Sequence, residues 1–391
     1  MTYAQVRVPC RPRVGYESAL GGKGDALKLV LFSDLHLDTP FAWAGPALAR
    51  SRRIALQQTL ENILSVASDV KADAVLCGGD LYEHEMISPD TEDFLRQSFG
   101  EIAPIPVYIA PGNHDWFGPE SAYQRIDWSS NVTIFSKSSL ERVEIEDGLS
   151  LWGAAHRAPA NTDGFLDDFT VDGSGVHLAL FHGSELNWTA ALVDGKVAHA
   201  PFEEKQISDA GLDHAFLGHY HKPFDGPHHT YPGNPDPLTF GETGNRGLVV
   251  ATVGSDGAIK SERVSVAVTT VTDLEVDVAG ATNGGEVREK VSEALEGLIG
   301  VARVTLHGEL AEQVDLQLSD LEGIESDLDD VLYQFDRIHV AYDLETIAAE
   351  QTVRGQFVTA VLEAGLPEDE SQRIITAGLR AFDGRDDLEI L

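Results

Sequence analysis

Short apolar runs recur along this chain, and polar residues follow each run within a few positions. Such nearly continuous runs are typical of strands that are buried on both faces of a sheet. We expect five buried strands, at 27–32, 74–77, 106–110, 176–181 and 214–217. The intervening segments 49–70 and 91–99 carry apolar residues at largely helical spacing. Strand alternating with helix predicts an α/β fold.

Four later segments have the pattern of edge or antiparallel strands: 142–146, 150–154, 248–253 and 258–266. Gly148 and the pair Asp256-Gly257 supply the turns expected between them. With the buried strands, they predict two layered sheets with helices on the outside.

The pattern changes near residues 268–273. A strand at 274–278, a helix at 287–298 and a strand at 302–306 then predict a small β-α-β unit, and 350–391 is mostly helical. We therefore predict four segments: an irregular N-terminal arm at 1–26, a main domain at 27–268, a small α+β capping domain at 269–345 and a helical tail at 346–391.

Two segments have more than one interpretation. The locally basic arm is interpreted as a solvated segment, with a DNA-contacting arm as the alternative. The tail carries two apolar stripes, formed by Phe357, Val358, Val361 and Leu362 and by Ile374, Ile375, Leu379 and Phe382. Packing within the chain is the default for such stripes, and docking of a partner is the alternative.

Candidate metal ligands lie at or just past the end of every buried run. They are Asp34, His36, Asp80, Asn113, His114, His182, His219 and His221. The crevice beyond the carboxyl ends of strands is where sites form in open α/β sheets. If the backbone is extended, residues two apart project to the same side, as Asp34 and His36 would. Carboxylate, amide and imidazole ligands suit Mn, Fe or Zn, and two such ions clamp the oxygens of a phosphoryl displacement.

Each motif alone is a weak signal, because most Asp-x-His and Gly-Asp pairs are ordinary loop residues. Gly112-Asn113-His114-Asp115 after a buried strand is more specific. The ordered set of all five motifs favours a metal site over chance.

The charge balance indicates the habitat of the source organism more than it indicates the substrate. The chain has 64 acidic and 28 basic residues, a formal charge of -36, and its last lysine is Lys290. A nucleic-acid partner would favour the opposite sign, but acidic, lysine-poor surfaces also suit a salt-loaded cytoplasm. We therefore expect a halophilic, cytoplasmic protein. No apolar stretch of the sequence is long enough to span a membrane, and residues 1–7 lack the apolar core that we would expect of a secretory signal.

With these motifs, residues 27–265 resemble the calcineurin-like metallophosphoesterases, which share a two-layer β-sandwich flanked by helices and a dinuclear metal centre. A looser resemblance, carried by the order of residues 80–84, 218–223, 231–234 and 240–244, is to the DNA-repair exonucleases typified by the nuclease subunit of the SbcCD complex. There, a capping domain and a helical tail follow the main domain.

The resemblance implies roles for these residues. Asp34, His36 and His221 would hold one metal; Asn113, His182 and His219 would hold the other; Asp80 would bridge the two. Manganese is the implied metal, and His114 would protonate the leaving oxygen. Relatives often carry a substrate-orienting His three residues after the bridging Asp. That position is Glu83 here and His84 follows it, so either His84 takes the role or the role is absent.

The resemblance implies a 3′→5′ DNA exonuclease, with endonuclease activity as an addition, acting in double-strand-break repair. Its partners would be DNA and a coiled-coil ABC-type ATPase of the SbcC kind that binds the helical tail, and a homodimer is a further alternative. We expect Arg50, Arg52 and Arg53 either to meet phosphates or to form a solvated helix face. The alternatives are a small-molecule phosphodiesterase or phosphatase and a non-catalytic scaffold. No Arg follows the Gly79-Asp80 motif as it would in a protein-phosphatase-like site, and the complete ligand set argues against the scaffold.

Overall fold

The computed structural model describes residues 26–160, 162–188, 198–311, 314 and 316–383. The predicted N-terminal arm lies outside these residues except for Ala26, which begins the first strand. Contacts divide the chain into two compact units. Unit 1 comprises residues up to 34, 60–233 and 248–264, and unit 2 comprises 35–59, 234–247 and 265 onward. The predicted domains are contiguous segments, and their boundaries remain predictions.

The first sheet of unit 1 has the strand order β12-β11-β1-β2-β3-β4. Its strands are β1 (Ala26–Phe32), β2 (Ala74–Cys77), β3 (Val107–Ile109), β4 (Val132–Ile134), β11 (Gly247–Gly254) and β12 (Ile259–Ser265). The neighbours from β1 to β4 are parallel, whereas β11 is antiparallel to β1. Every residue of β2 and β3 is buried, so the prediction of doubly covered strands is confirmed there.

The second sheet of unit 1 has the strand order β5-β6-β7-β8-β10-β9. Its strands are β5 (Glu141–Glu146), β6 (Leu149–Gly153), β7 (Val176–His182), β8 (His214–Gly218), β9 (Phe224–Asp225) and β10 (His229–Tyr231). One apolar core contains Leu29 and Leu76 of the first sheet with Leu178 and Phe216 of the second. The two-layer sandwich is therefore confirmed.

Helices connect these strands: α1 (Pro46–Asp69), α2 (Pro89–Glu101), α3 (Ala122–Arg125) and α5 (Glu204–Asp209). Ser88 caps α2 by accepting a hydrogen bond from the Thr91 amide, and Pro89 begins the helix. Helix α1 buries Leu60 and Ile63, but Ile54 is 57% exposed. Helical spacing alone therefore overestimated the width of the apolar face of α1.

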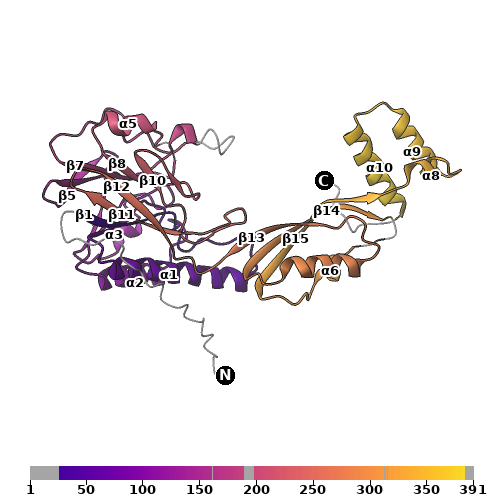
Figure 1. The fold of residues 1–391 in the computed structure, drawn as a ribbon, viewed down its shortest axis with the longest axis horizontal. Coiled ribbons are helices and arrows are strands. Elements are labelled where there is room, and N and C mark those ends of the chain that lie inside the picture. Colours follow the sequence, from indigo (N-terminus) through magenta and orange to yellow (C-terminus); the bar gives the residue numbers. More distant parts are fainter. Residues whose placement is uncertain (1–25, 161, 189–197, 312–313, 315, 384–391) are drawn as a thin grey trace, which may run out of the picture. The chain divides into compact units, whose positions relative to one another are not determined.

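Unit 2 contains a parallel three-stranded sheet, in the order β13 (Val271–Asp277), β14 (Gly300–Ala311) and β15 (Leu328–Ala341). Helix α6 (Gly284–Leu295) connects β13 to β14 and buries Val287, Val291 and Leu295, and the short α7 (Leu318–Leu321) precedes β15. Figure 1 shows α6 along the sheet that β13, β14 and β15 form. The predicted β-α-β unit is confirmed, and β15 extends it.

The chain ends in three helices, α8 (Leu344–Ala348), α9 (Val353–Glu363) and α10 (Glu368–Asp383). A small core of Val358, Val361, Ile375 and Leu379 joins α9 to α10, so the inner residues of the two predicted stripes pack on each other. Leu362 and Phe382 remain about half exposed, at 51% and 48%. Within the described residues, no helix is both long and apolar enough to cross a membrane.

Candidate metal centre

Five strands of unit 1 carry a predicted ligand at or just past their carboxyl ends. Asp34 follows β1, Asp80 follows β2, Asn113 follows β3, His182 ends β7 and His219 follows β8. Strands β1 to β3 are mutually parallel, as are β7 and β8, so within each sheet these ends lie at one edge. The structure therefore brings the predicted ligands to the strand ends that the apolar runs indicated.

The loops that carry these side chains have an uncommon backbone conformation. Asp34, Asp80 and His219 have φ values of 56°, 50° and 115°, in a region that residues other than glycine rarely adopt. His36, in the segment assigned to unit 2, has a φ of 51° and is buried. The expectation of extended backbone at Asp34 and His36 is therefore wrong. Strained backbone of this kind clusters at functional sites.

His182 is the side chain on which the other ligands converge. Its Nε2 atom lies 3.2 Å from Asp80 Oδ2, 3.1 Å from Asn113 Oδ1 and 3.3 Å from His219 Nδ1. Asp34, Asp80 and His182 also offer ligand atoms that all lie within 4.8 Å of one another, and all three side chains are buried. Strand ends from both sheets thus present oxygen and nitrogen lone pairs to one small volume.

A hydrogen bond from Nδ1 of His182 determines that Nε2 is the nitrogen available to a metal. The Nδ1 atom lies 3.0 Å from the carbonyl oxygen of Gly78 and therefore donates a hydrogen bond to it. In the neutral ring, this leaves the Nε2 lone pair facing Asp80 and Asn113, as in histidines that bind metals. Burial lowers the pKa of His182, but the neighbouring carboxylate of Asp80 outweighs burial and raises it to about 9.

Asp34 connects β1 to the histidine loop after β8. Both of its carboxylate oxygens accept a hydrogen bond from the amide of His219, at 3.0 and 3.2 Å. His221 offers a ligand atom within 4.8 Å of that of Asp34. Burial holds the pKa of His219 well below its ordinary value, so this ring stays neutral.

Asp115 organises the loops after β2 and β3, although the sequence pattern assigned it no role. It is fully buried and accepts hydrogen bonds from the amides of Gly112 (2.6 Å), Leu81 (2.7 Å) and Asp80 (3.2 Å) and from the hydroxyl of Tyr123 (2.6 Å). Burial, with the nearby charge of Asp80, raises its pKa to about 6. Its place at the end of the Gly-Asn-His-Asp motif is the signal that could have identified it.

His114 is exposed, unlike the buried ligands, and Glu83 is its partner. Its Nδ1 lies 2.9 Å from Glu83 Oε2, while its backbone amide donates to Asp80 Oδ1 at 2.8 Å. His84 instead stacks on Trp116, with ring centroids 3.7 Å apart. The side chain that contacts His114 is therefore that of Glu83, at the position where relatives often carry a histidine, and not that of His84.

The expectation for the three arginines of α1 needs one correction. Arg52 is only 2% exposed, lies 3.8 Å from Asp236, donates to the Pro237 carbonyl and stacks on Phe41 at 5.4 Å. A guanidinium enclosed in this way is neither a phosphate contact nor part of a solvated face. Arg50 is exposed and Arg53 is half-buried, so their predicted contacts with phosphate remain predictions.

Two histidines that looked like ordinary structural residues also lie near His182. His156 is fully buried; its Nε2 donates to the carbonyl of His182 (2.7 Å), and its Nδ1 accepts from the hydroxyl of Thr162 (2.8 Å). Burial lowers its pKa to about 3, so it is neutral. His199 has its ring centroid 5.4 Å from that of His219. No local sequence motif identifies His156 or His199, because the residues that they contact are distant in the sequence.

The donor set fits divalent metal ions of borderline character. Carboxylate, amide and imidazole side chains lie within 3.3 Å of His182 Nε2, and this mixture of oxygen and nitrogen ligands suits such ions. Glycines make room for this approach: a Cβ atom on Gly218 would collide with the carbonyl oxygen of Gly78 and lie 2.8 Å from His182 Nδ1. The glycines around His182 thus allow the loops that carry the candidate ligands to approach one another closely.

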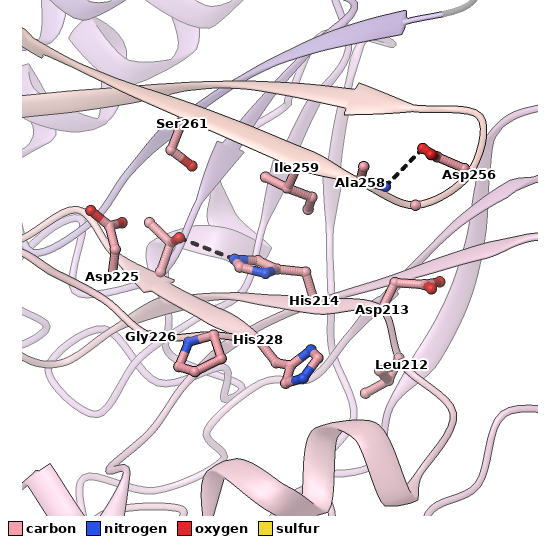
Figure 2. Close-up of a pocket in the computed structure, with 13 residues that line it drawn as sticks. Leu212, Asp213, His214, Asp225, Gly226, His228, Asp256, Ala258, Ile259 and Ser261 are labelled. Atoms are coloured by element: carbon pink, nitrogen blue, oxygen red, sulfur yellow. Dashed lines mark hydrogen bonds between the residues drawn. The ribbon is translucent and has the colours of Figure 1, made fainter.

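A separate cavity of about 670 Å³ lies elsewhere in unit 1 (Figure 2). Its lining includes His214, Asp225, His228 and Asp256, and His214 Nε2 is 3.0 Å from the Thr230 hydroxyl. None of the described residues that line it is a predicted metal ligand. The chemistry of His182 and its neighbours is therefore not located in this cavity.

The chain matches a protein family and known proteins over part of its length. The family model for calcineurin-like phosphoesterases matches residues 27–223, just over half of the chain. The uncharacterized metallophosphoesterase YhaO of Bacillus subtilis (strain 168) is 28% identical over 252 residues, 60% of this chain and 59% of YhaO. The DNA double-strand break repair protein Mre11 of Methanopyrus kandleri is 25% identical over 300 residues, 68% of this chain and 62% of that protein.

The chain thus spans about six tenths of the length of these relatives. Among solved structures, GAP50 of Plasmodium has a TM-score of 0.39 and 11% identity, covering 62% of this chain and 85% of that one. TT1561 of Thermus thermophilus has a TM-score of 0.35 and 12% identity, covering 61% of this chain and 99% of that one. Both of these structural likenesses are weak.

Proposed function

Because this chain belongs to the calcineurin-like phosphoesterase family, we propose that it is a DNA nuclease that hydrolyses phosphodiester bonds with two divalent metal ions. The observation that carries the proposal is the convergence of Asp80, Asn113 and His219 on His182 within 3.3 Å. The resemblance to Mre11 supports DNA as the substrate, and the family resemblance favours Mn²⁺ as the metal.

In this proposal, Asp34, His36 and His221 would hold one ion, Asn113, His182 and His219 would hold the other, and Asp80 would contribute to both. The ligand atoms of Asp34 and His221, which lie within 4.8 Å of each other, support the first group. His36 is assigned to this ion by the resemblance to the phosphoesterase family. The ions would polarise the phosphoryl oxygens and lower the pKa of water so that it can act as the nucleophile.

The remaining steps belong to side chains of this protein. His114 is exposed, so its Nε2 can reach a substrate and donate a proton to the leaving sugar oxygen. Glu83 accepts from Nδ1, orients the imidazole and stabilises the imidazolium, which carries the proton that Nε2 donates. Asp80 Oδ1 accepts from the His114 amide, which couples the acid to the metal-binding loop.

Two partner surfaces belong to the proposal. Arg50 and Arg53, at the start of α1, are the arginines of that helix that remain available to DNA phosphates. The half-exposed Leu362 and Phe382 of the C-terminal helices are the proposed contact with a coiled-coil ATPase. Replacing both with Ser should abolish co-purification with the ATPase while the variant stays folded by circular dichroism. Retained co-purification would remove this surface from the proposal.

The deciding experiment measures degradation of end-labelled single- and double-stranded DNA with Mn²⁺ or with EDTA, at low and at molar KCl. Metal-dependent degradation that His114→Ala abolishes is the expected result. Bis(p-nitrophenyl) phosphate and a cyclic nucleotide are assayed in parallel. Hydrolysis of the small esters alone would identify a small-molecule phosphoesterase, and no hydrolysis by a metal-loaded protein would favour the scaffold.

A further inference from the structure

His199 lies beside the candidate metal centre, one ring removed from His182. Its ring centroid is 5.4 Å from that of His219 and 6.3 Å from that of His156. Both of these neighbours contact His182, the first through its ring nitrogen and the second through the His182 carbonyl. His199 is therefore packed directly against the residues that surround the proposed ligands.

The backbone of His199 is fixed to the strand extension that carries His182. Its amide donates to Ser184 Oγ at 3.0 Å, and its carbonyl accepts from the Ser184 amide at 2.9 Å. The Phe202 amide donates to the Ser184 carbonyl at 3.0 Å, which continues this short ladder. Because Ser184 follows His182 by two residues, the position of the His199 ring is tied to that of His182.

The two nitrogens of the His199 ring have different surroundings. Among the described residues, Nδ1 is buried and has no hydrogen-bond partner, although His199 as a whole is only half-buried. A buried N–H group without an acceptor is more costly and rarer than a bare acceptor. This favours the tautomer in which Nδ1 is bare and Nε2 carries the proton. His199 thus carries an N–H donor on Nε2, the nitrogen opposite the buried Nδ1.

We propose that His199 contacts the substrate and donates its Nε2–H to a non-bridging oxygen of the phosphodiester. The proposal rests on the phosphoesterase function proposed above. Phosphate oxygens are strong acceptors of hydrogen bonds, and a donor held in place before the reaction stabilises charge that develops on them. If the His199 ring had only a packing role beside His219, an aromatic ring without a nitrogen could replace it.

Two substitutions separate the donor from the ring. His199→Phe keeps an aromatic ring beside His219 and removes the donor, whereas His199→Gln loses the ring and keeps an amide N–H at a similar reach. The matched control is His228→Phe, which alters an exposed histidine at the separate cavity. The full-length protein is loaded with Mn²⁺, and hydrolysis of bis(p-nitrophenyl) phosphate and metal content per chain are measured.

We expect His199→Phe to lower kcat/KM by about 100- to 1,000-fold, as loss of one transition-state donor does, with unchanged Mn²⁺ content. His199→Gln should stay within a few-fold of the wild type. Wild-type kcat/KM in His199→Phe would overturn the proposal, as would loss of Mn²⁺ from that variant or an equal loss of activity in His199→Gln.

A second measurement separates this proposal from the proposed function. Inorganic phosphate is titrated into the Mn²⁺-loaded proteins by calorimetry, which requires no hydrolysis. Weaker phosphate binding by His199→Phe, but not by His199→Gln, supports the contact even if no ester is hydrolysed. Equal phosphate binding by the wild type and both variants would overturn it, even if the enzyme is an active nuclease.

Discussion

The Nδ1 atom of His114 lies 2.9 Å from Oε2 of Glu83. Glu83 comes three residues after the buried Asp80, and Asp80 in turn accepts a hydrogen bond from the His114 amide. The proposed acid is therefore held at its backbone by a proposed metal ligand and at its side chain by a carboxylate. This arrangement gives Glu83 a positioning role where related exonucleases often carry a histidine.

Replacing Glu83 with Gln should lower kcat by about 10- to 100-fold and leave KM nearly unchanged. The reason is that the neutral amide stabilises the imidazolium less and permits the other ring tautomer. Steady-state hydrolysis of bis(p-nitrophenyl) phosphate measures both constants. Glu85→Gln, an exposed residue of the same loop, is the control. A variant with wild-type kcat would remove Glu83 from the mechanism.

The buried strands and the motifs that follow them could be predicted because their signals are local. Continuous apolar runs identify β2, β3, β7 and β8, and polar residues directly after them identify Asp80, Asn113, His182 and His219. The topology then brings these residues together, since all of them lie at carboxyl ends of parallel strands.

What the sequence could not predict depends on partners far along the chain. Arg52 lies on a helix and looks solvated, but Asp236 and the Pro237 carbonyl enclose it. Asp115 organises two loops because amides of the loop after β2, which is distant in sequence, donate to its carboxylate. Strand β15 mixes exposed and half-buried side chains, so its pattern is faint.

Removing the hydroxyl that donates to Asp115 should destabilise the protein. Tyr123→Phe leaves one buried carboxylate oxygen with fewer donors, and hydrogen bonds to charged groups contribute about 1.5–3 kcal/mol. The loss should be smaller at low pH. The raised pKa of Asp115, about 6, means that its favourable contribution is complete below about pH 4 and is lost as pH rises through 6.

Urea unfolding of the metal-free protein at pH 5 and 7 measures this effect. Tyr108→Phe is the control, because within the described chain the Tyr108 hydroxyl has no hydrogen bond that its loss would break. An unchanged midpoint in Tyr123→Phe would contradict the role assigned to this hydrogen bond.

Metal affinity should rise with pH because the metal displaces a proton from His182. The pKa of His182 in the metal-free protein is raised to about 9, so below that pH the ring is protonated and binding releases one proton. The same raised pKa stabilises the metal-free fold fully below about pH 6.5, and this contribution is lost as pH rises through 9. Mn²⁺ affinity should therefore increase about tenfold per pH unit between about pH 7 and 8.

The matched comparison is between His182→Ala and His219→Ala. Both should bind Mn²⁺ more weakly, but only the first should lose the pH dependence, because His219 is neutral over this range. Calorimetry in two buffers of different ionisation enthalpy counts the released protons. A pH-independent affinity in the wild type would contradict the role of His182.

A methyl group on Gly218 should disrupt the centre without touching any charge. The added Cβ would collide with the Gly78 carbonyl, the acceptor that fixes the His182 ring. Overpacking of this kind costs about 1–3 kcal/mol, and Mn²⁺ affinity should fall with it. Gly45→Ala is the control because no atom lies within 4 Å of its added Cβ. Urea unfolding and Mn²⁺ titration measure both effects, and wild-type values for Gly218→Ala would mean that the loops relax freely.

The formal charge of -36 should make the fold depend on salt. Self-repulsion among the 64 acidic residues opposes the compact state at low ionic strength, and the screening length falls to about 3 Å at 1 M salt. We expect the thermal midpoint to rise by about 5–10 °C between 0.1 and 3 M KCl, which corresponds to a few kcal/mol for a domain of this size.

Differential scanning calorimetry in KCl, beside sucrose at matched osmolality, separates charge screening from solvent exclusion. Sucrose should reproduce only a small part of the shift, because it does not screen charge. A midpoint that is flat or falling with KCl would contradict adaptation to a salt-loaded cytoplasm. In that case the acidic surface would need another explanation, and its repulsion of DNA would count against the nuclease proposal.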